Sequence, residues 1–230
     1  GGGPEAAVSL RSDLIVTTEN TLAAGVIGLG SMGLGMAQSM VNRGIKVSGF
    51  DINATAVAKL VEAGGGGAGS VTDVARHADV LLVVVVNAAQ TDAVLYGEKG
   101  AAAAMKRGSV IISSATMAPD DARKLAAKAE ALGLLYLDAP ISGGATKAAI
   151  GQLTVMASGT QETFKRARPV LDAIAATVYE LGDAAGIGAS FKMVNQLLAG
   201  VHIAAACEAV TFAKKLGLDL PTVYKVITAS

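Results

Sequence analysis

A short apolar segment that runs directly into a glycine-rich turn places the strongest constraint on this fold. Residues 24–27 are apolar, and Gly28-Leu29-Gly30-Ser31-Met32-Gly33 follows them without a break. In a strand, turn and helix unit, the first glycine allows a tight turn. The second lets the backbone approach a pyrophosphate, and the third lets the helix pack close to the strand. Free N–H groups at the start of such a helix bind phosphate. We therefore predict a dinucleotide site here, with the helix beginning near Ser31.

The segments after this turn come in the order that a dinucleotide site requires. The helical pattern ends at residues 42–44, a strand follows over 45–50, and Asp51 ends that strand. An acid about 20 residues beyond the glycines holds the ribose hydroxyls of NAD. Its charge would also repel the 2′-phosphate of NADP, so the predicted cofactor is NAD. Alternatively, Asp51 is a turn residue before Asn53, a suitable N-cap for a helix over 54–63.

Charge and cysteine content exclude several classes of function. The 19 Lys and Arg residues balance the 19 Asp and Glu residues and are interspersed with them, so no basic stripe for nucleic acid or anionic lipid is expected. Cys207 has no internal disulfide partner, and its alanine-rich surroundings predict a buried, inert thiol in a reducing compartment. The longest apolar run, residues 80–86, is far shorter than the roughly 20 residues of a membrane span. We expect a cytoplasmic protein without nucleic-acid or membrane partners.

The rest of the chain alternates strand and helix patterns, which predicts an α/β fold with a Rossmann-like, doubly wound, mostly parallel sheet. Strands are expected over residues 80–86, 109–112, 134–138, 153–157 and 178–181, helices over 71–76, 119–132 and 160–175, and a loop over the glycine cluster 64–69. His77 is expected at a solvent-side helix end. We divide the chain into a disordered or artificial leader (1–22), a cofactor-binding domain (23–185) and the start of an all-α domain (186–230). That last region opens with a long helix over 189–216, and a second helix begins at Pro221.

Three stretches together resemble the β-hydroxyacid dehydrogenases, the family of 3-hydroxyisobutyrate dehydrogenase and tartronate semialdehyde reductase. They are residues 28–33, 138–144 (Asp-Ala-Pro-Ile-Ser-Gly-Gly) and 191–196 (Phe-Lys-Met-Val-Asn-Gln). Within the family, residues 86–90 and 196–203 are most similar to the L-threonate dehydrogenase branch. The resemblance implies NAD-dependent oxidation of a small hydroxy acid by a homodimer or higher homo-oligomer. It also implies further helices beyond Ser230 that close over the nicotinamide.

Two short polar segments are candidates for binding substrate and cofactor. Ser142-Gly143-Gly144 follows a strand and leads into a short helix over 145–150, so its N–H groups and hydroxyl predict a small anion cradle. The family resemblance implies that this cradle binds the substrate carboxylate. Alternatively, it is an ordinary turn. Thr116 matches a family threonine near the nicotinamide, with a helix-cap hydroxyl as the alternative. The resemblance also places Asn87 among the cofactor-binding residues.

Lys192 is the candidate catalytic residue. It lies early in the long helix, and 100° steps place Asn195 and Gln196 on its face. The family has its catalytic lysine at this position. Lys192 would accept the alcohol proton. Either Asn195 or Gln196 would hold a substrate hydroxyl, and the sequence does not decide between them. No metal is needed because lysine and amides stabilise the developing alkoxide. The helix N-terminus and apolar neighbours predict a lowered pKa, whereas the alternative is a lysine that extends to solvent. His202 lies off this face.

The predicted function is therefore NAD-dependent oxidation of a small hydroxy acid, with L-threonate to 2-oxo-tetronate as the preferred reaction. A reaction on 3-hydroxyisobutyrate or tartronate semialdehyde is an alternative, as is imine reduction. A non-catalytic nucleotide-binding module is the alternative of another class, and Lys192 argues against it.

Overall fold

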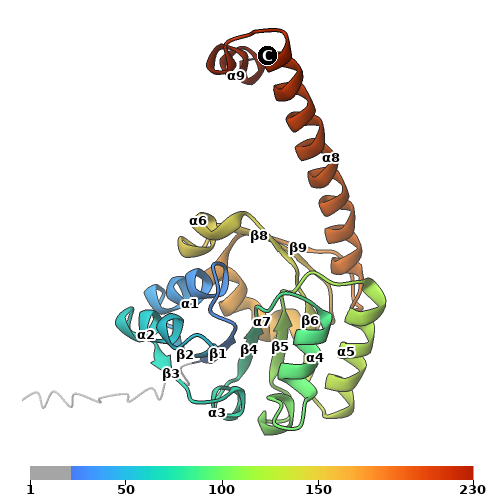
Figure 1. Cartoon of the computed structure of the whole chain (residues 1–230). Coiled ribbons are helices and arrows are strands. Elements are labelled where there is room, and N and C mark those ends of the chain that lie inside the picture. Colours follow the sequence, from blue (N-terminus) through green and yellow to red (C-terminus); the bar gives the residue numbers. More distant parts are fainter. Residues whose placement is uncertain (1–21, 230) are drawn as a thin grey trace, which may run out of the picture.

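The computed structural model describes residues 22–229, which form two sheets surrounded by helices (Figure 1). Most elements begin and end within three residues of the expected positions. In chain order they are β1 (Ala23–Ile27), α1 (Gly33–Asn42), β2 (Lys46–Phe50), α2 (Ala54–Glu62), β3 (Gly66–Gly67), α3 (Val71–Arg76), β4 (Val80–Val83), α4 (Ala88–Tyr96), η1 (Ala102–Ala104), β5 (Val110–Ser113), α5 (Pro119–Ala131), β6 (Leu135–Asp138), β7 (Ile141–Ser142), α6 (Gly144–Ala149), β8 (Leu153–Ala157), α7 (Gln161–Ile174), β9 (Ala175–Glu180), α8 (Ile187–Lys215) and α9 (Leu220–Thr228).

The larger sheet has the expected doubly wound topology. Its strand order is β3-β2-β1-β4-β5-β6, and every neighbouring pair is parallel. The order of the strands reverses between β1 and β4. In sheets of this kind, ligands bind outside the carboxyl ends of the strands at that reversal.

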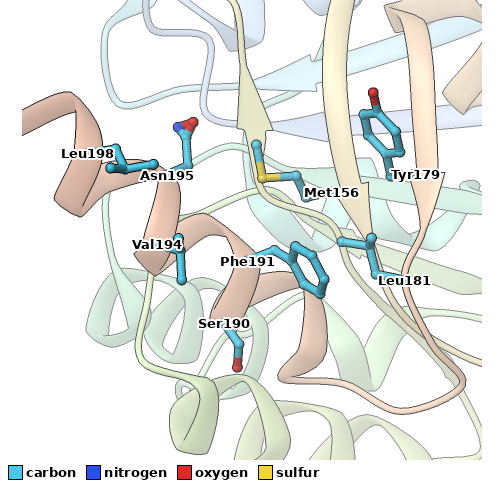
Figure 2. A pocket seen from close by; sticks show the side chains of 8 residues that line it. All are labelled: Met156, Tyr179, Leu181, Ser190, Phe191, Val194, Asn195 and Leu198. Carbon is cyan, nitrogen blue, oxygen red and sulfur yellow. The ribbon is translucent and has the colours of Figure 1, made fainter.

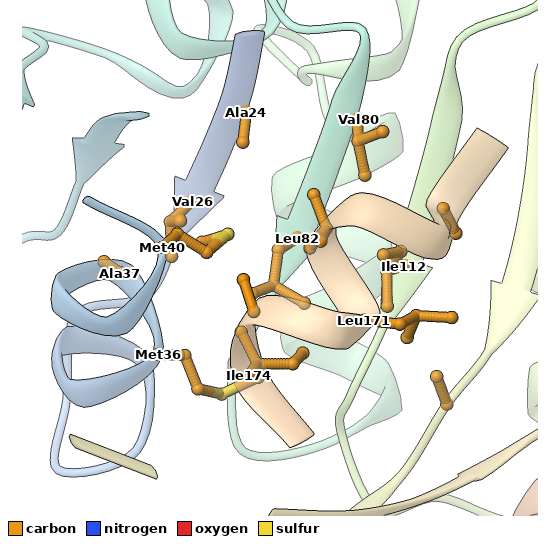
Figure 3. Close-up of a cluster of buried hydrophobic side chains, with 14 of the residues drawn as sticks. Ala24, Val26, Met36, Ala37, Met40, Val80, Leu82, Ile112, Leu171 and Ile174 are labelled. Carbon is orange, nitrogen blue, oxygen red and sulfur yellow. The ribbon is translucent and has the colours of Figure 1, made fainter. Parts of the chain in front are cut away.

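Two apolar layers cover the two faces of this sheet. Successive side chains in a strand point to opposite faces, so Leu82 contributes to one layer and Leu81 to the other. Helices α1, α2 and α7 pack on the Leu82 side, whereas α3, α4 and α5 pack on the Leu81 side. Figure 3 shows the first layer, in which Met36 of α1 and Leu171 of α7 lie against the central strands. The central strands are therefore buried on both faces, as their unbroken apolar sequence predicts.

The strands at 153–157 and 178–181, expected to extend the main sheet, instead belong to a second sheet of order β7-β8-β9. Strand β7 is antiparallel to β8, and β9 is parallel to β8. The element between β7 and β8 is α6, which has only six residues. A parallel crossover needs a dozen residues or more, so the chain turns back here into an antiparallel pair. A single antiparallel bridge between Asp138 and Ser158 links the two sheets.

Smaller expectations also need correction. The glycine cluster expected as a loop contains the edge strand β3, because Gly66 and Gly67 pair with β2. Strand β4 ends at Val83, since the chain leaves the sheet before reaching α4, a helix that the sequence patterns missed. Of the expected leader, residues 1–21 lie outside the described part, and Leu22 packs against the core.

Helix α8 leaves the sheets near its N-terminus and extends away from them, with α9 at its far end (Figure 1). Most of its side chains are exposed, and so is Cys207, which corrects the expectation of a buried thiol. The alanines around Cys207 are exposed as well, so an apolar sequence there does not imply burial. By length and composition alone, α8 could cross a membrane. The sequence analysis considered only unbroken apolar runs, and polar residues interrupt α8, so it did not identify this helix as long and apolar enough to cross a membrane.

Candidate active site

The turn over residues 28–33 has the geometry that its glycines predict. Gly28 has φ +92°, and a Cβ there would lie 2.3 Å from the Val84 carbonyl oxygen. A Cβ at Gly33 would lie 1.9 Å from the Gly28 carbonyl oxygen, so α1 approaches β1 as closely as the backbone allows. Around Gly30, by contrast, no described atom outside Gly30 and its two chain neighbours lies within 4 Å of the Cβ position. The protein thus fills the space at Gly28 and Gly33 and leaves it open at Gly30, where a pyrophosphate would approach.

The start of α1 is also suited to an anion. Its N-cap, Met32, makes no side-chain capping bond, and no acidic residue lies in its first turn. Ser31 is exposed and Met32 is half-buried. The helix was expected to begin near Ser31 and begins two residues later, at Gly33. Uncapped N–H groups at a helix N-terminus carry partial positive charge and bind phosphate. Leu29 differs from its neighbours because its side chain is buried in the core.

Asp51 links this turn to the end of β2. One carboxylate oxygen accepts the Leu29 N–H at 2.7 Å, and the other accepts the Asn53 N–H at 2.8 Å. Asn53 in turn caps α2 by accepting the Thr55 N–H, as the sequence indicated. The turn role of Asp51 is therefore confirmed. Its ribose role stays a prediction, and the carboxylate lies beside the glycine turn as that role requires.

Five strands end in one row across the main sheet. Phe50 pairs with Ile27, Ile27 with Val83, Val83 with Ser113, and Ser113 with Asp138. The residues that come next in each strand are therefore side by side at the carboxyl edge of the sheet. These segments carry most of the predicted site residues: Asp51, Gly28 to Gly33, Asn87, Thr116 and Ser142 to Gly144. Parallel pairing thus brings together groups that are far apart in the sequence.

Asn87 and Thr116 follow β4 and β5 at this edge. The Asn87 side chain caps α4 by accepting the Gln90 N–H at 3.0 Å. Thr116 is exposed, and the N-cap of α5 is Ala118, which has no side-chain capping bond. The helix-cap interpretation of Thr116 is therefore wrong, because the helix begins three residues later at Pro119. Its role near the nicotinamide stays a prediction.

Ser142-Gly143-Gly144 crosses from β7 into α6. Gly143 is the N-cap of α6 and makes no side-chain capping bond, and Gly143 and Gly144 are exposed. The segment is a turn, as the simpler interpretation held, and it lies at the uncapped start of a short helix. A turn of this kind can also hold a carboxylate.

Lys192 is turned toward the domain and is only 7% exposed. Its Nζ donates to the carbonyl oxygen of Ile141 at 2.8 Å, directly before Ser142 in the chain. Burial lowers the pKa of Lys192, in the expected direction. The expected cause was wrong in part, because the flanking Phe191 and Met193 are more than half exposed. The side chain is buried by the β7 segment, so the interpretation of a lysine extending to solvent is also wrong.

The two amides on the same helix differ in their surroundings. Asn195 is partly buried and lines a groove of about 580 Å³ between α8 and the second sheet, whereas Gln196 is exposed. Figure 2 shows the groove, whose lining is almost entirely apolar: Met156, Tyr179, Leu181, Ser190, Phe191, Val194, Asn195 and Leu198. Asn195 is thus the more enclosed of the two amides, although neither Lys192 nor residues 142–144 line this groove. Exposed His202 lies further along α8, and exposed His77 is the C-cap of α3, as expected.

The sequence analysis missed two polar residues beneath the site. Asp138 and Ser158 are both buried, and their side chains accept backbone N–H groups from the first turn of α8. Asp138 belongs to a stretch noted for its family resemblance, but nothing in the sequence pairs it with a helix 48 residues away. Within residues 22–229, no cluster of three His, Cys, Asp or Glu side chains could hold a metal ion.

Comparison with known families gives two matches that together cover the described chain. Residues 23–182 match the NAD binding domain of 6-phosphogluconate dehydrogenase. Residues 186–230 match the family described as NAD-binding of NADP-dependent 3-hydroxyisobutyrate dehydrogenase. The boundary between the matches falls just before α8.

Individual relatives agree with these matches. L-threonate dehydrogenase of Haemophilus influenzae is 50% identical over 204 residues, which are 88% of this chain and 68% of the relative. The 3-hydroxyisobutyrate dehydrogenase of Pseudomonas aeruginosa is 36% identical over 89% of this chain and 68% of its own length. A crystal structure described as 3-hydroxyisobutyrate dehydrogenase from Salmonella typhimurium superposes with a TM-score of 0.87. It is 47% identical and covers 91% of this chain and 73% of that one.

Proposed function

This chain belongs to the β-hydroxyacid dehydrogenases, NAD-binding enzymes that act on CH–OH donors, and we propose that it oxidises L-threonate to 2-oxo-tetronate. The family and the type of reaction follow from the matches above. The substrate, the site residues and the lysine mechanism are the proposal. The preference for L-threonate is supported by relatives of that name at 45 to 50% identity. Proteins described as 3-hydroxyisobutyrate dehydrogenase are 36% identical in Pseudomonas aeruginosa and 47% identical in Salmonella typhimurium, so 3-hydroxyisobutyrate is the alternative substrate.

The turn over residues 28–33 and the first turn of α1 would hold the pyrophosphate of NAD. Open space at Gly30 and an uncapped helix start support this assignment. Asp51 would accept the ribose hydroxyls, and Asn87 and Thr116, at the ends of adjacent strands, would lie along the remainder of the cofactor. Bound NAD supplies the hydride acceptor for the reaction.

The buried Lys192 amine carries the mechanistic part of the proposal. A neutral amine that donates one N–H to the Ile141 carbonyl keeps its lone pair free for a proton. The proton of the C2 hydroxyl would pass to Nζ as hydride leaves C2 for the cofactor, which gives a ketone and an ammonium group. One hydride, which carries two electrons, would leave C2 and one proton would leave the hydroxyl for Nζ, so the step balances. Lys192 is thus the general base in oxidation and the general acid in reduction.

Substrate binding is assigned to the segments on either side of this lysine. Ser142, Gly143 and Gly144 would hold the carboxylate through their N–H groups and the Ser142 hydroxyl. An amide on α8 would hold a second hydroxyl, with Asn195 and Gln196 as the two candidates, of which Asn195 is the less exposed. Ile141, which contacts Lys192, is directly followed by Ser142, so the base and the carboxylate site are coupled through one backbone segment.

The proposal also covers the domain boundaries, the oligomeric state and the location of the protein. We assign residues 23–185 to the cofactor-binding domain and 186–230 to the start of the helical domain. We also propose a cytoplasmic homodimer or higher homo-oligomer that binds neither nucleic acid nor membrane. In this assembly α8 would connect domains, which is supported by its match to the second family and by Lys192 packing on β7. The length of α8 would then span the distance between the two domains, and α8 would not insert into a membrane.

A substrate panel tests the proposal. Purified protein is supplied with L-threonate, 3-hydroxyisobutyrate and, for reduction, tartronate semialdehyde and a cyclic imine, each with NAD(H) and NADP(H). We expect NADH formation with L-threonate and an NMR spectrum of 2-oxo-tetronate as the product. Turnover of 3-hydroxyisobutyrate without any of L-threonate would reject the substrate and leave the family assignment in place.

A further inference from the structure

The carboxylate of Asp138 lies at a junction of three elements. Asp138 ends β6, and its side chain is buried, with only 1% of the residue exposed. The Oδ2 atom accepts the backbone N–H groups of Gly186 and Ala189, each at 2.9 Å. The Ser158 hydroxyl lies 3.5 Å from the same oxygen. One oxygen atom therefore connects the end of a strand in the main sheet to the start of α8.

These contacts do what a capping side chain does, but from a distant part of the chain. The first N–H groups of a helix have no intrahelical partners, and the N-cap residue of α8, Gly186, has no side chain to offer. Asp138 supplies two acceptor contacts in its place. The Ser158 hydroxyl supplies a third by accepting the Gly188 N–H at 2.9 Å. A Cβ at Gly188 would lie 2.4 Å from the Met156 carbonyl oxygen, so this turn is seated directly on β8.

A second contact lies one turn further along the helix. Lys192 follows Ala189 by three residues, and its Nζ donates to the carbonyl of Ile141, which follows Asp138 by three residues. The segment 138–141 thus holds α8 at two points one helical turn apart. Two points fix the rotation of a helix about its axis, which one point cannot do.

We propose that Asp138, together with Ser158, is the positioning residue for Lys192. It sets the rotation and depth of α8 so that Nζ lies beside Ser142-Gly143-Gly144. This inference rests on the proposed role of Lys192 as the base. A misplacement of a catalytic group by about 1 Å can lower turnover roughly 10²-fold, so a loosened first turn should be visible in kcat.

The contacts predict which substitutions of Asp138 and Ser158 keep activity and which lower it. Both N–H groups that Asp138 accepts from α8 go to one oxygen, so Asp138→Asn can keep an acceptor at that position and lose only the charge. Asp138→Ala removes the acceptor. Ser158→Ala removes the Gly188 contact and the 3.5 Å contact to Asp138 but leaves both Asp138 contacts to α8, and is a milder variant. Asp79→Ala is the matched control, because Asp79 also accepts a backbone N–H, that of Ala23 at 3.0 Å, at the opposite edge of the sheet.

The experiment measures kcat, KM and NAD affinity for these variants of the full-length protein, alone and combined with Lys192→Met. We expect Asp138→Ala to lower kcat at least about tenfold with NAD affinity within about twofold, and Asp138→Asn to stay within about threefold of the parent. In the Lys192→Met background, Asp138→Ala should change kcat less than about twofold, because residues that act through each other are not additive. In the cofactor-free protein, amide hydrogen exchange of residues 186–192 should be faster in Asp138→Ala and unchanged in Asp79→Ala.

The outcomes separate this inference from the function on which it rests. If Lys192→Met keeps most of the activity, the lysine mechanism fails and the inference fails with it. If Lys192→Met is inactive but Asp138→Ala keeps kcat, or lowers it equally in both backgrounds, the positioning role alone is overturned. If Asp138→Ala does not bind NAD, Ser158→Ala replaces it as the test variant. A loss of kcat smaller than that expected for Asp138→Ala would support the positioning role, and an unchanged kcat would contradict it.

Discussion

The Leu29 N–H donates to the carboxylate of Asp51 at 2.7 Å, which joins the glycine-rich turn to the strand that follows it. The carboxylate therefore orients the turn, in addition to the ribose-binding role proposed for it. A substitution at Asp51 has two separable effects, one on the turn and one on the charge. Asp51→Asn can keep an acceptor for Leu29 while it removes the charge and the acceptor for Asn53, whereas Asp51→Ser also removes the acceptor for Leu29.

The first prediction concerns cofactor choice. The parent protein should prefer NAD over NADP by at least about tenfold in kcat/KM, which corresponds to about 1.4 kcal/mol. Both Asp51→Asn and Asp51→Ser should narrow the gap, since neither repels the 2′-phosphate, and Asp51→Ser should also weaken NAD binding more. Steady-state kinetics with both cofactors measure this, with Asp219→Asn at a distant helix cap as the control. Equal efficiency with the two cofactors in the parent would contradict the role of Asp51.

The second prediction concerns Lys192. Lys192→Met should lower turnover by roughly 10² to 10⁴-fold because it removes the general base, and the affinity for NAD should be unchanged. Single-turnover kinetics and cofactor titration measure the two effects separately. Lys214→Met, an exposed lysine in the last turn of the same helix, is the control. Retention of most of the activity in Lys192→Met would mean that the base lies elsewhere.

The third prediction is the pH dependence of the reaction. Burial lowers the pKa of Lys192 from its ordinary value of 10.5, so neutral amine is available at lower pH than for an exposed lysine. Oxidation needs the neutral form and should rise with pH, with a midpoint below 10.5. Reduction needs the ammonium form and should fall over the same range. The profiles are measured in both directions, and a limb that persists in Lys192→Met would belong to another group.

A fourth prediction separates lost activity from lost stability. Lys192 has a lower pKa in the folded protein than in the unfolded chain, so the unfolded chain binds more protons between those two values. The stability contribution of this group therefore increases as pH rises through that window. Lys192→Met should abolish this slope and leave the melting temperature at neutral pH unchanged or higher, because no charge is then buried. A clearly lower melting temperature would show that the ammonium group stabilises the fold.

The fifth prediction tests the core. Leu171 of α7 is fully buried against the main sheet (Figure 3), and Leu171→Ala should lower the free energy of unfolding by about 2 to 5 kcal/mol. Val61 in α2 is half exposed, so Val61→Ala should change it by less than about 1 kcal/mol. Denaturant unfolding measures both. Similar losses in the two variants would mean that α7 is not anchored in the core.

Local patterns in the sequence were sufficient to predict the first half of the fold. The glycine turn, the acid at the end of the second strand and the unbroken apolar run at β4 each report a constraint on adjacent residues. Parallel pairing then follows, because β-α-β units with short loops have few alternative arrangements. The second sheet could not be predicted in this way. The lengths of α6 and of the loops around it decide whether a strand extends the main sheet, and strand patterns alone do not show this.

From the sequence alone one could predict a dinucleotide site at the glycine turn and place Lys192 close to two amides along one helix. The burial of Lys192 on Ile141, with Phe191 and Met193 exposed, becomes visible only in the folded chain. It also decided that Cys207 is exposed and that Asp138 caps a helix 48 residues away. The physical reason is that glycine geometry and helical periodicity act between neighbours. Burial and capping depend instead on which distant surface a helix meets, and no local pattern encodes that surface.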